Sequence, residues 1–108
     1  MARSLSPLAS QTLKLLANSI KTHRIRRGWS IQELAQRVGV SHPTIIKVER
    51  GDPSVAIGTV FEAATLVGVP LFDEDPDVRA RYEERLRTEL KLLPQAARRK
   101  RIQADDDF

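Results

Sequence analysis

Two short amphipathic stretches joined by a three-residue break constrain the fold of this 108-residue chain more than any other feature. The break is Gly39-Val40-Ser41, and about eight residues on each side of it repeat apolar side chains at helical spacing. Ser30 and Glu33 have the spacing of a capping box before the first stretch, and Ser41 can cap the second. Glycine lets the chain reverse with a positive φ at little cost. The pattern therefore predicts two closely crossing helices, a helix-turn-helix.

The remaining sequence also has helical periodicity and no strand pattern. We expect a flexible arm at residues 1–9, because it is polar and broken by Pro7, and a helix from Ser10 to Gly28. Another helix is expected at about residues 57–67. Asp75-Pro76 predicts the start of a last helix that runs to about residue 92. The expected fold class is all-α.

Positive charge is concentrated in the first half of the chain. Residues 1–58 carry nine Lys and Arg against three acids, a net charge of +6, whereas residues 59–108 have a net charge of −2. A basic half of this kind is typical of proteins with an anionic partner, and nucleic acid is the leading candidate. A basic surface that serves only solubility is the alternative.

The composition disfavours several classes of function. Cysteine is absent, and the only histidines, His23 and His42, lie on different elements, so we expect no metal and no cofactor. Ser41 beside His42 is not an arrangement of nucleophile and base, and we expect no enzymatic activity. The sequence has no signal-peptide pattern and no apolar run of membrane-spanning length, which predicts a cytoplasmic protein without a membrane partner.

The helix after Gly39-Val40-Ser41 has the features of a recognition helix. Its first residues are not needed for a core, so its N-terminal end is expected to point outward into the major groove of DNA. His42 and Thr44 can exchange hydrogen bonds with base edges, and Lys47 can reach guanine acceptors or a phosphate. Pro43 offers an apolar surface that suits a thymine methyl group.

Residues 29–51, WSIQELAQRVGVSHPTIIKVERG, resemble the helix-turn-helix of the lambda repressor/Cro (Xre) family, and with flanking helices the likeness covers roughly residues 13–72. The resemblance implies a five-helix, lambda-repressor-like domain in a sequence-specific transcriptional repressor. It places five residues where the family reads bases: Ser41, His42, Pro43, Thr44 and Lys47. Contacts with the DNA backbone are expected from Gln32, Arg26, Arg27 and Arg50.

The resemblance has two further consequences. Arg24 and Glu49 correspond to a largely buried ion pair that ties the first helix to the end of the recognition helix, so we expect them to be structural. Family members often have Gln at the start of the second helix, where it touches a phosphate, but this chain has Ile31. That phosphate contact is therefore either lost or taken over by Gln32.

One small helix-turn-helix domain makes too few contacts for tight specific binding, so we expect a homodimer on double-stranded operator DNA with an inverted repeat. The candidate surface for dimerisation or partner binding consists of apolar residues at and after the end of the domain: Leu71, Phe72, Val78, Tyr82, Leu86 and Leu90. The alternative is that the last helix packs back on its own domain.

The chain is also similar to HipB-like antitoxins, which are encoded beside HipA-type kinase toxins. The discriminating parts are the segment ERGDPSVAIGTV and the basic-then-acidic tail. This likeness implies a toxin-antitoxin system in which the chain represses its own operon and binds the kinase. A plain Xre-type repressor of phage or metabolic type, and a protein-interaction module that has lost DNA binding, are the alternatives.

These predictions divide the chain into four parts. Residues 1–9 form the arm and residues 10–72 form the DNA-binding domain. Residues 73–93 form the C-terminal helix for dimerisation or partner binding, and residues 94–108 form the tail.

Overall fold

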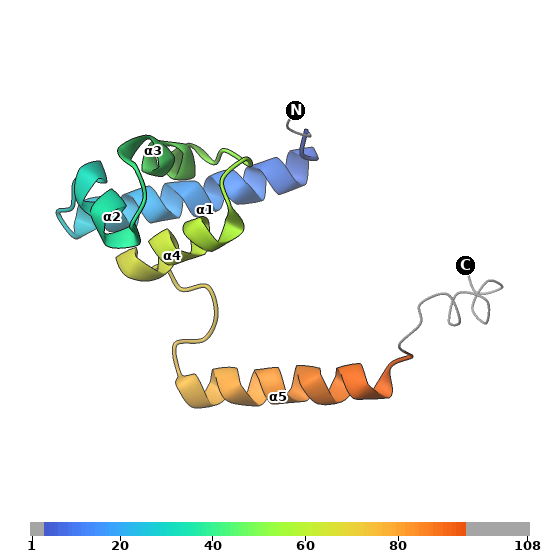
Figure 1. The fold of residues 1–108 in the computed structure, drawn as a ribbon. Helices are drawn as coiled ribbons and strands as arrows, with labels where there is room; N and C mark the ends of the chain where they lie inside the picture. Colours follow the sequence, from blue (N-terminus) through green and yellow to red (C-terminus); the bar gives the residue numbers. More distant parts are fainter. Residues whose placement is uncertain (1–3, 95–108) are drawn as a thin grey trace. The chain divides into compact units, whose positions relative to one another are not determined.

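The computed structural model describes residues 4–94, which form five α-helices and no strand (Figure 1). The helices are α1 (Pro7–Arg26), α2 (Ile31–Val38), α3 (His42–Arg50), α4 (Ile57–Val67) and α5 (Pro76–Leu92). The chain divides into two compact units: unit 1, Met1–Leu71, contains α1 to α4, and unit 2, Phe72–Phe108, contains α5. The all-α, lambda-repressor-like fold class is thus confirmed.

Helix α1 begins three residues earlier than the sequence pattern predicts. Ser6 is its N-cap, because Ser6 Oγ accepts a hydrogen bond from the Ala9 N–H at 3.2 Å. Pro7 follows in the first helical turn, where its missing N–H costs nothing and its fixed φ suits the helix. The prediction took Pro7 as a break, and it was wrong for residues 7–9. Residues 1–3 lie outside the described part of the chain.

Local hydrogen bonds fix the turn between α2 and α3. Ser30 and Glu33 form the predicted capping box: Ser30 Oγ accepts from the Glu33 N–H at 3.0 Å, and Glu33 Oε1 accepts from the Ser30 N–H at 3.1 Å. Gly39 ends α2 with φ 87°, in the left-handed region that favours glycine. Ser41 then caps α3 by accepting from the Thr44 N–H at 3.3 Å.

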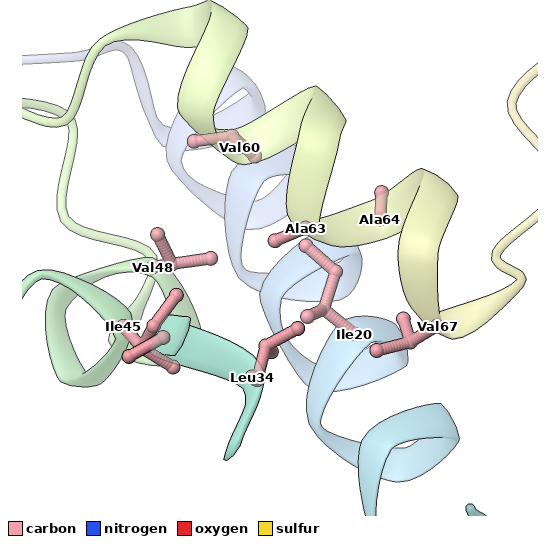
Figure 2. Close-up of a cluster of buried hydrophobic side chains, with 9 residues drawn as sticks. Ile20, Leu34, Ile45, Val48, Val60, Ala63, Ala64 and Val67 are labelled. Atoms are coloured by element: carbon pink, nitrogen blue, oxygen red, sulfur yellow. The ribbon is translucent and has the colours of Figure 1, made fainter. Parts of the chain in front are cut away.

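The core of unit 1 lies where its four helices meet (Figure 2). It consists of nine buried side chains: Ile20, Leu34, Ala35, Ile45, Val48, Val60, Ala63, Ala64 and Val67. Ala63 and Ala64 are fully buried, so their small side chains allow α4 to approach its neighbours closely. Because α1 and α4 pack against the helix-turn-helix, they hold α3 in a fixed orientation.

A buried ion pair adds to this framework. Arg24 Nε donates to Glu49 Oε2 at 2.6 Å and Arg24 Nη2 donates to Glu49 Oε1 at 3.0 Å, so the contact is bidentate. Arg24 Nη1 also donates to the Trp29 carbonyl at 2.8 Å. The two charged side chains are only 9% and 5% exposed. The ion pair that the family resemblance implies is therefore present, and it joins α1 to the end of α3.

Helix α5 has a different character. Asp75 Oδ1 accepts from the Asp77 N–H at 2.9 Å, and Pro76 occupies the first turn, as the sequence predicts. No residue of α5 is buried. None of the helices within residues 4–94 is both long and apolar enough to cross a membrane.

Candidate nucleic-acid interface

The N-terminal end of α3 is exposed although the helix is anchored in the core. Ile45 and Val48 are buried, whereas His42, Pro43 and Lys47 are exposed. Because one face of α3 packs in the core, the opposite face is exposed to solvent. It carries the imidazole of His42 and the ammonium group of Lys47. This is the face on which the sequence places the base-contacting residues.

Two of the five candidate base-contacting residues interact with each other. The hydroxyl groups of Ser41 and Thr44 are 2.8 Å apart and hydrogen-bonded, while Ser41 also serves as the cap of α3. Thr44 is partly buried. Their side chains thus stabilise the first turn of α3. Among residues 4–94, the His42 and Lys47 side chains make no such internal hydrogen bond, which leaves them available to a ligand.

The candidate contacts with the DNA backbone are distributed over three helices. Arg26 is exposed at the end of α1, Gln32 is exposed in the first turn of α2, and Arg50 is exposed in the last turn of α3. Gln32 and Arg50 thus lie within the helix-turn-helix and Arg26 lies just before it, and all three side chains are exposed.

Arg27, in contrast, has a structural role that the sequence analysis missed. Its Nε donates to the Val67 carbonyl at 2.9 Å, at the C-terminal end of α4. Its guanidinium carbon lies 5.3 Å from the centre of the Trp29 ring, and that of Arg37 lies 4.1 Å from the same ring. Arg27 therefore links α1 to α4, although the residue is exposed, and its proposed contact with the DNA backbone stays a prediction. No local signal could reveal a partner 40 residues away.

A groove of about 230 Å³ opens beside α3, and the sequence analysis did not foresee it. Its lining comes from α1, α2 and α3, and consists of Lys21, Ile31, Ile46, Glu49 and Arg50. Each of these residues looks ordinary within its own helix. Only the packing of three helices brings two cations and two isoleucines together.

The loop after α3 carries a fixed negative charge. The Ser54 N–H and hydroxyl donate to Asp52 Oδ1 at 2.8 and 2.7 Å. These hydrogen bonds, with smaller effects of the Lys47 and Arg50 charges, hold the pKa of Asp52 below its ordinary value of 3.8. Asp52 is therefore ionised at neutral pH and opposes a close phosphate at this loop.

Within the part of the chain that the structure describes, no group of three or more His, Asp or Glu side chains could hold a metal ion. The available chemistry consists of cations, hydrogen-bonding groups and apolar surface around one exposed helix end, as in a nucleic-acid-binding surface.

Comparison with known proteins identifies the family of the chain. A model of the helix-turn-helix family matches residues 20–73, which are half of the chain and include α2, α3 and α4. The chain belongs to this family, of Xre type, whose members bind DNA and regulate transcription.

Three regulators are similar to the chain. The HTH-type transcriptional regulator SutR of Escherichia coli is 35% identical over 57 residues, which are 53% of this chain and 32% of SutR. The cryptic phage CTXphi transcriptional repressor RstR of Vibrio cholerae is 25% identical over 79 residues, 73% of this chain and 71% of RstR. A hypothetical transcription factor of Neisseria meningitidis is 29% identical over 58 residues, 54% of this chain and 55% of that protein. The chain thus spans about a third of SutR and about half of the Neisseria protein. No solved structure matches the chain at a significant level.

Proposed function

We propose that this chain is a sequence-specific transcriptional repressor that reads operator DNA with the exposed face of α3, as a homodimer. The observation that carries this proposal is the rigid presentation of the first turn of α3. Its inner side is held by the core, its end is held by the Arg24–Glu49 ion pair, and its outer side bears His42 and Lys47. The proposed role places the protein where DNA is accessible, in the cytoplasm.

In this proposal α3 lies with its N-terminal end in the major groove. Lys47 donates to the O6 and N7 acceptors of a guanine, and the His42 ring exchanges a hydrogen bond with a base edge. Pro43 contacts a thymine methyl group. Ser41 and Thr44 hold the first turn in place and keep their remaining hydrogen-bonding capacity for a base.

Unit 2 supports the homodimer. Phe72, Val78, Tyr82 and Leu86 line an apolar groove of about 460 Å³ along α5. The rings of Phe72 and Tyr82 have centroids 6.3 Å apart, so the aromatic residue before the helix continues the stripe. Helices in water gain most of their stability from packing an amphipathic face, and no residue of α5 is buried. We propose that the α5 of a second copy covers this stripe, which would place two copies of α3 on two half-sites.

The test is a selection from a random duplex library at near-physiological salt, with the wild-type chain, His42→Ala and Lys47→Ala. The wild type should enrich a defined sequence, and each variant should relax the preference at one or two positions of it. Lys91→Ala, which removes the same charge from α5, is the control and should leave the sequence unchanged. Enrichment of no sequence, with binding that disappears as salt rises, would contradict the proposal. The chain would then be a protein-interaction module with only non-specific attraction to DNA.

A second candidate function is that of an antitoxin for a HipA-type kinase toxin. It is supported by the similarity of residues 49–60, ERGDPSVAIGTV, to HipB-like antitoxins, and by the exposed stripe of α5, which could serve such a partner. The other part of that similarity, the tail, lies outside the described residues from position 95 onward. The similarity to the phage repressor RstR favours the plain Xre-type repressor instead.

Co-expression with a kinase encoded beside this gene separates the two. An antitoxin should co-purify with that kinase, and removal of residues 94–108 should weaken the complex. A kinase that never co-purifies would leave the plain repressor, and equal binding by the truncated chain would exclude a role for the tail.

A further inference from the structure

The groove beside α3 has a distinct electrostatic character. The negative charge of Glu49 is balanced by Arg24, which donates hydrogen bonds to both of its carboxylate oxygens, so the pair has no net charge. Lys21 and Arg50 are exposed at the groove and form no ion pair within residues 4–94. Asp52 interacts electrostatically with Arg50 but does not line the groove. The lining is therefore cationic, with apolar walls formed by Ile31 and Ile46.

The groove adjoins the proposed base-reading surface. His42, Ile46 and Arg50 are spaced by four residues on α3, so they follow one another along the same side of the helix. Ile31 is the first residue of α2, the helix that crosses the DNA backbone when a recognition helix enters the major groove. A duplex read by the first turn of α3 would therefore pass one of its strands over this groove.

Another lysine of α1, Lys14, also lies close to the end of α3. A Cβ added at Gly51 would lie 3.1 Å from Lys14 Cγ, so the stem of Lys14 crosses the end of α3. Lys14 and Lys21 are two helical turns apart on α1, and both reach toward the C-terminal part of α3. Two cations of α1 therefore lie beside the C-terminal part of α3.

We propose that the groove binds one phosphate of the DNA backbone in each half-site. Lys21 and Arg50 donate hydrogen bonds to its oxygens, and Ile31 and Ile46 contact the adjoining deoxyribose. The proposal rests on the function proposed above, and it gives Lys21 a positioning role. It also explains how the chain can have Ile31 where family members often have a glutamine that touches a phosphate. In this chain Lys21 of α1 and Arg50 of α3 would bind the phosphate instead.

The experiment uses the selected operator with single phosphates replaced, one at a time, by uncharged methylphosphonates. For the wild-type chain, replacement of one phosphate per half-site should weaken binding about tenfold. Lys21→Gln should bind the unmodified operator more weakly than the wild type, and replacement of that phosphate should weaken its binding markedly less than tenfold, because only Arg50 still contacts it. The slope of log affinity against log salt should fall by about one, with the base preference unchanged.

Arg50→Gln should also lose part of the sensitivity at the same phosphate, which identifies a shared site. The control is Lys14→Gln, which makes the same charge change on the same helix outside the groove. It should keep the full sensitivity to that phosphate. Thermal unfolding of each variant checks that the fold is intact.

If Lys21→Gln keeps the wild-type sensitivity at every phosphate, the groove does not bind the backbone, although the proposed function would stand. If the wild-type chain selects no operator at all, the proposed function has failed and the groove assignment falls with it.

Discussion

Unit 1 and α5 use the same kinds of side chain in opposite ways. Each of α1 to α4 buries part of its apolar face in a common core, whereas α5 leaves Tyr82 and Leu86 exposed. The same contrast holds for charge. The Arg24–Glu49 pair is buried and bidentate, but the side chains of the Arg87–Glu83 pair are 57% and 73% exposed. Unit 1 therefore owes its order to contacts within the chain, and the apolar surface of α5 suits a partner.

The largest expected effect is on the free energy of unfolding, and it distinguishes the buried Arg24 from the exposed Arg87. Arg24→Ala should lower the free energy of unfolding by about 3–5 kcal/mol, because it leaves the Glu49 charge buried without a partner. Arg87→Ala should change it by less than about 1 kcal/mol, since exposed ion pairs contribute little. Urea denaturation of both variants measures the difference. An unchanged melting temperature in Arg24→Ala would show that the ion pair is not structural.

Two leucines sharpen the comparison of the apolar surfaces. Leu34→Ala should destabilise unit 1 by about 2–5 kcal/mol, because it leaves a cavity in the core. Leu86→Ala removes the same atoms from the exposed stripe of α5, so it should weaken self-association without unfolding unit 1. Circular dichroism follows the first effect and sedimentation equilibrium follows the second. A Leu86→Ala chain that associates as strongly as the wild type would argue against α5 as the dimer interface.

Two glycines test the turn with a smaller effect. Gly39→Ala should cost about 1–2 kcal/mol, because an L-residue is strained at φ 87°. Gly58→Ala, inside α4, should instead stabilise the protein by about 0.4–1 kcal/mol. A Cβ at either position would meet no atom within 4 Å, so only the backbone conformation distinguishes them. Equal melting temperatures for the two variants would contradict this account of the turn.

The sequence predicts best those features that local rules decide. The capping box at Ser30 and the Asp75 start of α5 depend on hydrogen bonds within one turn, and the bounds of α4 follow from helical spacing and from Gly68 at its end. All agree with the structure. Pro7 was misjudged because a proline can either break a helix or begin one, and only the Ser6 cap decides between them.

The features that sequence reasoning missed depend on distant packing. Arg26 and Arg27 cannot be told apart by local sequence rules, and only the folded chain shows that Arg27 donates a hydrogen bond to α4. Lys21 is one of several cations on α1 until α2 and α3 complete its groove. The Arg24–Glu49 pair has the same long-range character, and the sequence alone offered it only through family resemblance.

The central claim is that unit 1 binds specific DNA sequences and that α5 forms the homodimer interface. The most direct test repeats the duplex selection with Leu86→Glu, which places a charge in the apolar stripe, beside the wild type. The wild-type chain should enrich an inverted repeat with half-sites about one helical turn apart. Leu86→Glu should enrich the same half-site without a fixed spacing. A wild-type chain that enriches only single half-sites, or a variant that keeps the full repeat, would contradict the claim.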